Sequence, residues 1–212
     1  MSLTLHLHPL SSYCHKVLIA LYENNTSFTP AILNPGDMAP FLKLWPIGKF
    51  PLLEDKARKH VIPESSIIIE YLDQHYPGPV KFIPADPDRA RETRMWDRFF
   101  DLHLHHHMQS IIGDRLRPAD KKDPFGVEQT RAKIKTSLDF LEQNIGSEWV
   151  MGKTFTMADC AAAPALFYID RIAPLGGTHP KAAAYLARVM ARPSYARALK
   201  EAEPFFQYFP KE

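Results

Sequence analysis

Residues 9–16 read Pro-Leu-Ser-Ser-Tyr-Cys-His-Lys, and they follow a stretch in which polar and apolar residues alternate. The alternation over Leu3–His8 predicts a strand with one buried face. Ser11 and Ser12 are natural N-caps for the helical pattern that comes next. The start of a helix carries unpaired N–H groups and about half a positive charge, which favours a thiolate or another anion. Helix caps are more common than anion sites, so this stretch alone predicts only a cap.

Two later motifs can likewise be interpreted either as part of a binding site or as ordinary structure. A proline after a bulky residue, as in Phe50-Pro51, marks an edge strand or a cis peptide bond. A cis bond would leave the main chain of Phe50 free to pair with an extended peptide. At the start of the next predicted helix, Ser65 can bind a carboxylate and Glu64 an ammonium, which suits the head group of an α-amino acid. Taken singly, these motifs also fit an edge-strand proline and a second helix cap.

The chain changes character near residue 76, where prolines become frequent. Before this point the patterns mix strands and helices, and beyond it every pattern is helical. The predicted elements are strands at Ser27–Leu33, Leu52–Leu53 and His60–Ile62, and helices at Phe41–Trp45, Ser65–His75, Arg89–Arg115, Ile134–Ile145 (stopped by Gly146), Met157–Arg171, Pro180–Ala191 and Ser194–Ala202. This order predicts an α/β domain over residues 1–78 and an all-α domain over residues 88–212.

Bulk composition excludes several classes of function. The 212 residues include 26 basic and 24 acidic side chains, a formal net charge of +2, so nothing favours nucleic acid or an anionic membrane as a partner. No apolar run approaches the roughly 18 residues of a membrane span, and no signal peptide is evident. The two cysteines, Cys14 and Cys160, indicate free thiols in a reducing compartment. We therefore expect a cytoplasmic location.

The order and spacing of the motifs resemble the cytosolic glutathione S-transferase superfamily, in particular a serine-type bacterial member. Redox relatives of that fold place C-x-x-C where this chain has Ser11-Ser12-Tyr13-Cys14. In the helical half, Phe155-Thr156-Met157-Ala158-Asp159 is similar to the family's N-capping box, with Phe155 and Cys160 as a hydrophobic staple. The resemblance covers the whole chain. It implies an α/β thioredoxin-like N-terminal domain plus an all-α C-terminal helical domain.

By the same resemblance, Ser11 is the catalytic residue. Its hydroxyl would donate a hydrogen bond to the sulfur of bound glutathione and so favour the thiolate. Ser12 remains an alternative donor, because sequence does not decide which of two adjacent hydroxyls faces the sulfur. Cys14 has no dithiol partner at position 11 and is interpreted as a packed helix residue.

The resemblance also assigns the residues that bind glutathione. Phe50, before a cis-Pro51, would pair through its main chain with the cysteinyl part. Glu64 and Ser65 would hold the γ-glutamyl end. Lys49 is the nearest cation for the glycyl carboxylate.

A histidine-rich stretch, residues 103–107, invites a metal interpretation. His103 and His107 stand at i and i+4 on a helix, which supplies only half of a tetrahedral site, so we expect no metal. In the resembled fold this helix borders the pocket for the second substrate. His105, His106 and Gln109 are therefore expected to line that pocket.

The function implied is conjugation of the glutathione thiolate to small electrophilic, largely apolar substrates, as in detoxification. Glutathione would be the co-substrate and a homodimer the expected assembly. The alternatives are a non-catalytic ligand-binding member of the same fold, or a related glutathione-dependent dehalogenase, isomerase or peroxidase. The sequence leaves the electrophile open.

Overall fold

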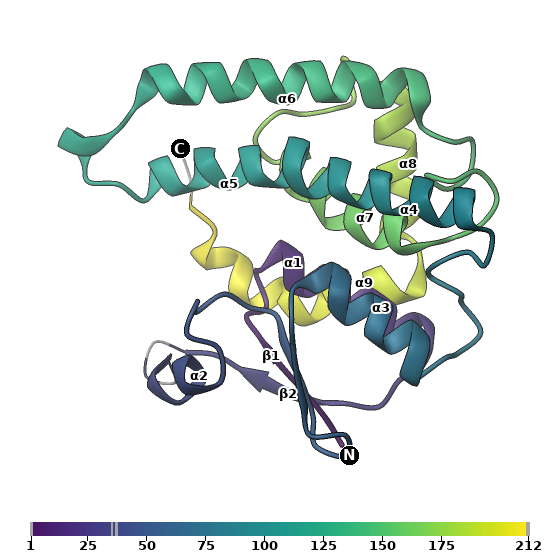
Figure 1. Ribbon diagram of the computed structural model, residues 1–212. Helices are drawn as coiled ribbons and strands as arrows, with labels where there is room; N and C mark the ends of the chain where they lie inside the picture. Colours follow the sequence, from purple (N-terminus) through teal and green to yellow (C-terminus); the bar gives the residue numbers. More distant parts are fainter. Residues whose placement is uncertain (1, 35, 37, 211–212) are drawn as a thin grey trace.

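The computed structural model describes residues 2–34, 36 and 38–210. The first part of the chain forms one mixed sheet with helices on both sides (Figure 1). Its elements in chain order are β1 (Leu3–Leu7), α1 (Ser12–Glu23), β2 (Thr29–Ile32), α2 (Met38–Leu44), β3 (Leu52–Asp55), β4 (His60–Pro63) and α3 (Ser65–His75). The strand order is β2-β1-β3-β4, with β1 parallel to β2 and the other pairs antiparallel.

The predicted alternation positions the sheet. In β1, Leu3, Leu5 and Leu7 are all buried, and Leu5 pairs with Leu53 of β3. Because successive strand residues point to opposite faces, Leu53 joins the main core while Leu52 packs with Phe41 of α2 in a separate small cluster. Helices α1 and α3 pack against each other, while α2 lies away from them in Figure 1.

The second part of the chain is helical, as predicted. Its elements are α4 (Pro87–Phe99), a π-helical segment (Phe100–His105), α5 (His106–Arg115), a 3-10 turn (Ala119–Lys121), α6 (Pro124–Asn144), α7 (Met157–Asp170), α8 (Pro180–Met190), α9 (Pro193–Ala202) and a 3-10 segment (Glu203–Tyr208). The fold class expected from the sequence, a thioredoxin-like α/β part plus an all-α part, is confirmed.

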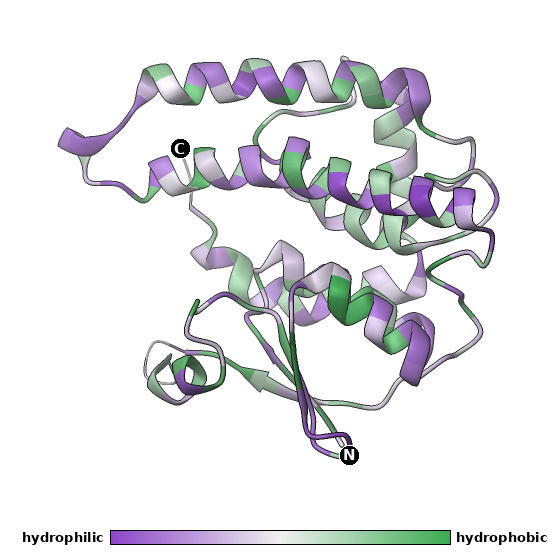
Figure 2. Cartoon of the chain, viewed as in Figure 1, coloured by the Kyte–Doolittle hydropathy of each residue, from purple (hydrophilic) through white to green (hydrophobic). Residues whose placement is uncertain are grey.

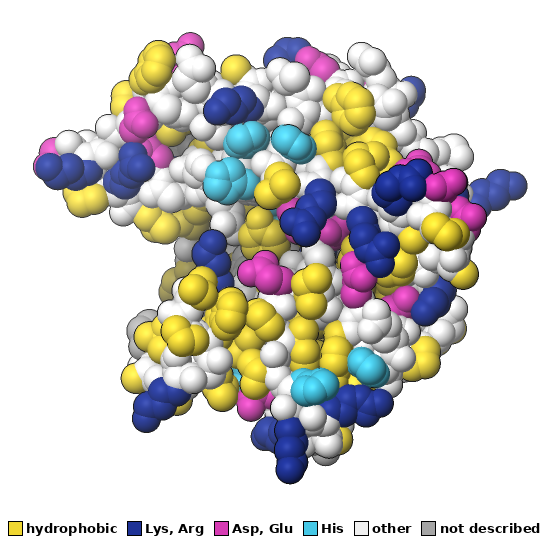
Figure 3. All heavy atoms as spheres, viewed as in Figure 1, with side chains coloured by type: hydrophobic (Ala, Val, Ile, Leu, Met, Phe, Trp, Pro, Cys, Tyr) yellow, Lys and Arg dark blue, Asp and Glu magenta, His cyan; other side chains and the backbone are white. Residues whose placement is uncertain are grey.

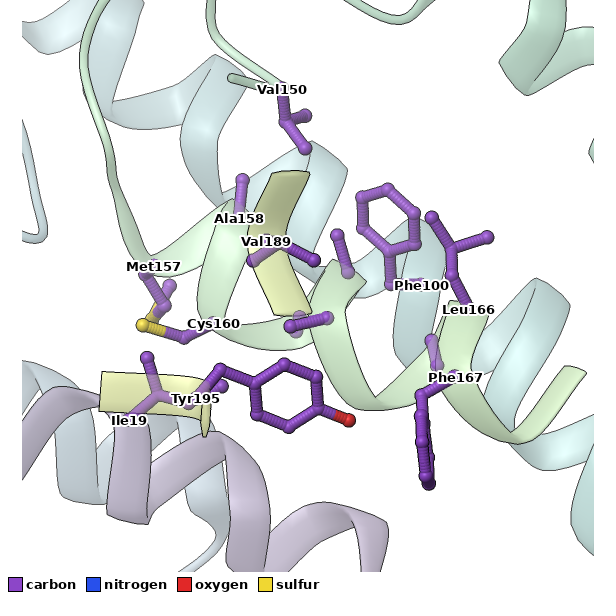
Figure 4. Packing of buried hydrophobic residues seen from close by; sticks show 14 of the residues in the cluster. Ile19, Phe100, Val150, Met157, Ala158, Cys160, Leu166, Phe167, Val189 and Tyr195 are labelled. Carbon is purple, nitrogen blue, oxygen red and sulfur yellow. The ribbon is translucent and has the colours of Figure 1, made fainter. Parts of the chain in front are cut away.

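Helix α7 is the centre of the core. Every residue from Met157 to Ile169 is buried, and the helix packs against α1 of the first part and α4 of the second. Figure 4 shows Ile19 of α1 and Tyr195 of α9 close to Cys160 of α7. The two parts thus share one apolar core. Helix α6 lies at the outer edge of the molecule, and Figure 2 shows it as mostly hydrophilic.

The predicted capping box at the start of α7 is present. The Asp159 carboxylate accepts hydrogen bonds from the backbone N–H groups of Val150 and Thr156 (both 2.8 Å), from the Thr156 hydroxyl (3.3 Å) and from the Tyr185 hydroxyl (2.8 Å). Burial raises the pKa of Asp159 to about 6, although these hydrogen bonds oppose the shift. Phe155 and Cys160, the predicted staple, are both buried in the main core.

The proline-rich segment between α3 and α4 has no regular structure, as expected, but it is anchored. The buried Phe82 receives a hydrogen bond at its carbonyl from the N–H of Met157 (3.1 Å), and its own N–H donates to Asp73 Oδ1 (3.0 Å). We propose that the two domains, residues 1–78 and 88–212, lie on either side of this segment.

The main departure from expectation lies in the predicted helix Arg89–Arg115. Its middle is π-helical, with the His106 N–H donating to the Asp101 carbonyl five residues earlier. Such a turn inserts an extra residue and changes which side chains face the core after it. Gly146 does follow the last turn of α6, and a Cβ there would lie 2.2 Å from the Trp149 carbonyl, so a side chain would not fit. Among the described helices, none is long and apolar enough to cross a membrane.

Candidate active site

A cavity of about 570 Å³ lies between the α/β part and the helices α4 and α5. It is within the size range of small-molecule sites, about 300–1,000 Å³. Figure 3 shows the molecule hollowed on its left side, between the half that carries α2 and the upper helices. The lining residues are Ser11, Tyr13, Trp45, Gly48, Lys49, Phe50, Pro51, Glu64, Ser65, Ser66, Ile67, Arg98, Asp101, Leu102, His106 and Gln109. The structure therefore brings the sequence-predicted residues together here, with the exception of His105.

The start of α1 reaches the cavity through Ser11. Ser11 is the N-cap, and its Oγ accepts a hydrogen bond from the N–H of Cys14 (3.3 Å). A hydroxyl that accepts one hydrogen bond still has its own O–H to donate. Ser12 is only 3% exposed and does not line the cavity. Cys14 is fully buried, and burial raises the pKa of its thiol to about 12, so it is an inert packing residue.

Tyr13 was missed by the sequence reasoning. It is half-buried at the cavity wall, its ring lies 4.6 Å from that of His105, and its hydroxyl is 3.5 Å from the Asp101 carbonyl. Burial, together with Asp101 and Glu64, raises its pKa far above the ordinary value, so the phenol stays neutral and able to donate a hydrogen bond. The only sequence signal was its place two residues after Ser11 in the same motif.

The loop before β3 forms a second wall. The Phe50–Pro51 peptide bond is cis, as anticipated, and Gly48 has a φ of +70°, a conformation in which glycine is favoured. Phe50 is half-buried and Lys49 is exposed at the rim. This loop therefore presents main chain and one cation to the cavity.

The start of α3 forms a third wall. Glu64 is exposed at the N-cap, with a φ of +67° that is rare for a residue other than glycine. Strained backbone of this kind is found most often at functional sites. Ser65, the first residue of α3, is 6% exposed and lies at the positive end of the helix.

Beneath the cavity lies a buried ion cluster that connects α1, α3 and α4. Lys16 is completely buried, and its Nζ lies 2.6 Å from Asp97 Oδ1, 2.7 Å from Asp101 Oδ2 and 2.9 Å from Ser66 Oγ. Ser66 in turn donates to Asp97 Oδ2 (2.7 Å). Burial alone would lower the pKa of Lys16, but the two carboxylates raise it, so the ammonium is charged. The cluster holds the three cavity walls in one arrangement, because breaking a buried ion pair leaves an uncompensated charge.

The fourth wall is one face of the α4–α5 helix. Arg98, Leu102, His106 and Gln109 recur every three or four residues and line the cavity, so the predictions for His106 and Gln109 agree with this geometry. Extending that spacing toward the N-terminus would have found Leu102 and Arg98.

The prediction that His105 lines the cavity is wrong. The π-helical turn directs His105 into the core, where it is 0% exposed and its Nδ1 lies 3.8 Å from Asp101 Oδ1. Burial lowers its pKa, which keeps the ring neutral. Among the residues that the structure describes, no group of three or more His, Cys, Asp or Glu side chains is placed to hold a metal ion.

The cavity thus combines a hydroxyl at a helix start, a stretch of main chain and a carboxylate–serine pair. Exposed cations, Lys49 and Arg98, lie at its rim. These groups suit an extended, mostly anionic ligand with one ammonium group.

Comparison with known proteins agrees with this geometry. Residues 5–80 match the glutathione S-transferase N-terminal domain and residues 124–188 the C-terminal domain. A stringent starvation protein A homolog of Coxiella burnetii is 30% identical over 95% of this chain and 93% of its own length. A glutathione S-transferase of Hyoscyamus muticus is 26% identical over 94% of this chain and 99% of its own length. The crystal structure of a Methylobacterium radiotolerans glutathione S-transferase in complex with glutathione sulfonate superposes with a TM-score of 0.82 at 27% identity, over 92% of this chain and 93% of that one. The chain belongs to the cytosolic glutathione S-transferase superfamily.

Proposed function

We propose that the protein conjugates glutathione to small electrophilic, largely apolar substrates, with Ser11 as the serine-type catalytic residue. The observation that carries this proposal is the position of Ser11. Its hydroxyl caps α1, accepts from Cys14 and lines the cavity, while its neighbour Ser12 is buried outside it.

The chemical role of Ser11 is to stabilise a thiolate. An ordinary thiol titrates at about 8.5, and lowering its pKa by roughly two units raises the thiolate at neutral pH from a few per cent to a majority. A hydrogen bond to a charged acceptor contributes about 1.5–3 kcal/mol, and a helix start adds about 0.3–1 kcal/mol. Together these magnitudes match the roughly 2.7 kcal/mol that the shift requires.

The remaining walls fit the rest of glutathione. Glu64 would accept from the γ-glutamyl ammonium, and Ser65 would donate to the neighbouring carboxylate. The main chain of Phe50, before Pro51, would pair with the cysteinyl unit. Lys49, exposed at the rim, would approach the glycyl carboxylate.

The electrophile would occupy the space between the start of α1 and the α4–α5 helix. Leu102 supplies apolar surface there, and His106 and Gln109 supply hydrogen-bond donors beside the neutral ring of Tyr13. This mixture favours an apolar substrate that carries an acceptor group, such as a nitro or carbonyl oxygen.

The test is conjugation of an aromatic halide, 1-chloro-2,4-dinitrobenzene, by wild type, Ser11→Ala and the matched control Ser12→Ala. Ser11→Ala should lower the rate near neutral pH at least about tenfold and raise the pKa seen in the pH–rate profile, because the thiolate loses a donor. Ser12→Ala should change neither. The reverse result would assign the role to Ser12.

Calorimetric titration separates binding from catalysis. Glu64→Ala and Ser65→Ala should each weaken glutathione binding by about 1–3 kcal/mol, since a charged ligand group would lose its partner. Glutathione binding without turnover on any electrophile would instead favour the non-catalytic alternative.

A homodimer and a cytoplasmic location complete the proposal. Ile67 of α3, Met95 of α4 and Leu102 of the π-helical segment are large apolar side chains, each 45–51% exposed, and Ile67 and Leu102 line the cavity. A second copy covering this face would remove them from water. The free, buried thiols of Cys14 and Cys160 fit a reducing compartment, where glutathione is abundant. Met95→Glu should shift the protein toward the monomer in analytical ultracentrifugation.

A further inference from the structure

The turn that leads into Ser11 is held from α7, a helix of the second part of the chain. This turn joins β1 to α1, and the N–H of Ser11 closes it by donating to the His8 carbonyl (2.9 Å). A peptide unit is planar, so the Leu10 carbonyl and the Ser11 N–H share one plane. The hydroxyl of Tyr168, in α7, donates to that Leu10 carbonyl (2.8 Å). The peptide plane that enters Ser11 is therefore fixed at both of its ends.

The preceding peptide unit is held in the same way. The Nε2 of the buried His15 lies 2.6 Å from the Pro9 carbonyl, and the N–H of Leu10 lies 3.2 Å from His8 Nδ1, which accepts from it. Because a carbonyl can only accept, Nε2 of His15 carries the proton. Every polar group of these two peptide units thus has a partner, and the turn has one well-defined conformation.

Tyr168 is held in its turn by the C-terminal segment, residues 203–210. The ring of Phe209 stacks on that of Tyr168, with 5.6 Å between the centroids and 25° between the planes. The Nη1 of Arg115, at the end of α5, donates to the Pro210 carbonyl (3.1 Å). Figure 1 shows the segment running from α9 past the start of α1 toward the end of α5. The C-terminal segment therefore fastens the helical part of the chain beside the Ser11 turn.

We propose that Tyr168 is a positioning residue for conjugation, which directs the Ser11 hydroxyl through the Leu10 carbonyl, and that Phe209 holds Tyr168 in place. The inference rests on the role proposed above for Ser11. Tyr168 is not among the residues that line the cavity, so it acts through the turn and not on the ligand. A misplacement of about 1 Å can lower a rate about a hundredfold, so a small shift of Ser11 would weaken its hydrogen bond to the thiolate.

The first test removes the hydroxyl of Tyr168 alone. Tyr168→Phe should lower kcat for 1-chloro-2,4-dinitrobenzene near neutral pH at least about fivefold, and should raise the pKa in the pH profile of kcat, which reports the bound state. The KM for glutathione should stay within about twofold, because Glu64 and Ser65 hold the ligand on another wall. The matched control is Tyr195→Phe, since Tyr195 is 0% exposed and its hydroxyl has no hydrogen-bond partner among the described residues. This control should change none of the three quantities.

A double variant shows whether the effect of Tyr168 passes through Ser11. If it does, Tyr168→Phe should lower kcat by less than about twofold when Ser11→Ala is already present, because the two changes then act on one interaction. A merely structural role would lower the rate by the same factor in both backgrounds, or would lower the melting temperature without moving the pKa.

A variant outside the core tests the second link. Phe209→Ala should change kcat and the pKa in the same direction as Tyr168→Phe, by about two- to fivefold in kcat, since Tyr168 loses only a neighbour. Tyr208→Ala, the same truncation at a ring that is 70% exposed, should have no such effect. Circular dichroism checks the fold of each variant, and Phe209→Ala decides the matter if Tyr168→Phe does not fold.

Three outcomes would overturn the proposal. They are a Tyr168→Phe variant that behaves like Tyr195→Phe, a loss of rate that is as large without the Ser11 hydroxyl as with it, and a Phe209→Ala variant that behaves like Tyr208→Ala. A Ser11→Ala variant that keeps the wild-type rate would instead overturn the proposed function, and the role of Tyr168 with it.

Discussion

The protein begins two of its helices with a hydroxyl cap, and the two starts have opposite fates. At α1, Ser11 is half-exposed, the third residue of the helix is Cys14, and the helix end faces a cavity. At α7, Thr156 is fully buried, and Asp159 binds the surrounding N–H and O–H groups.

The difference shows how one local motif serves two purposes. A helix start has unpaired N–H groups that need acceptors. At α7 the chain supplies the acceptor itself, and the end is closed. At α1 the third position carries no carboxylate, so the positive end remains available to a ligand. The start of a helix is open to an anionic ligand only where the chain places no carboxylate of its own against the N–H groups.

The largest effect should come from removing the carboxylate that accepts hydrogen bonds at the start of α7. Asp159→Ala would leave buried donors on Val150, Thr156 and Tyr185 without an acceptor, at about 1–3 kcal/mol each. We expect the free energy of unfolding to fall by about 3–5 kcal/mol in urea denaturation followed by circular dichroism. Glu64→Ala, at the exposed start of α3, should change it by under about 0.5 kcal/mol. A loss below about 1 kcal/mol for Asp159→Ala would mean that water replaces the box, and the contrast between the two ends would disappear.

The next largest effect is a loss of stability in acid that arises at the start of α1. His15 is fully buried, its Nε2 lies 2.6 Å from the Pro9 carbonyl, and burial lowers its pKa to about 4. Because the folded pKa is below the unfolded value of about 6.5, protons favour the unfolded chain in this window, and stability is lost as pH falls from about 6.5 toward 4. His15 should contribute a loss of about 2 kcal/mol between pH 7 and pH 5. The difference in unfolding free energy between wild type and His15→Gln, from urea curves at the two pH values, should therefore change by this amount.

Acid should act in the opposite direction at the α7 end. The folded pKa of Asp159, about 6, lies above the unfolded value of about 3.9, so the folded state takes up a proton as pH falls through 6. This contributes about 1.3 kcal/mol of added stability between pH 7 and pH 5. The measurement is the difference in unfolding free energy between wild type and Asp159→Asn at both pH values. If that difference is independent of pH, the four donors keep Asp159 ionised and the predicted opposition is wrong.

These two helix starts also show what sequence could and could not predict. The box at α7 was readable because Thr156 and Asp159 are three residues apart and interact within one turn. The limits of α3 and the alternation of β1 are local in the same sense. The choice between Ser11 and Ser12 is not a local property, because it depends on which side of α1 faces the cavity.

Long-range contacts account for the other misses. Lys16 reaches Asp101 across 85 residues of sequence, and no local pattern pairs them. The π-helical turn that buries His105 lies where α4 and the π-helical segment pack on α7. The expectation that this helix borders the pocket did not show which of its histidines face the pocket.

The smallest expected change in stability is the most informative about the comparison, because it comes from removing the capping hydroxyl at each of the two helix starts. Ser11→Ala deletes one acceptor for the N–H of Cys14 at a half-exposed position, where water can replace it, so we expect about 0.5–1 kcal/mol of lost stability. Thr156→Ala deletes a hydroxyl that is 0% exposed and one of the donors to Asp159, so we expect about 1–2 kcal/mol. Conjugation should respond in the reverse order: Ser11→Ala should lose most of its rate while Thr156→Ala, measured well below its melting temperature, should keep it. Urea unfolding and aromatic halide conjugation on the same two preparations decide the matter. If Ser11→Ala loses as much stability as Thr156→Ala and keeps its rate, the start of α1 is a structural cap like that of α7, and the open cavity beside it has another use.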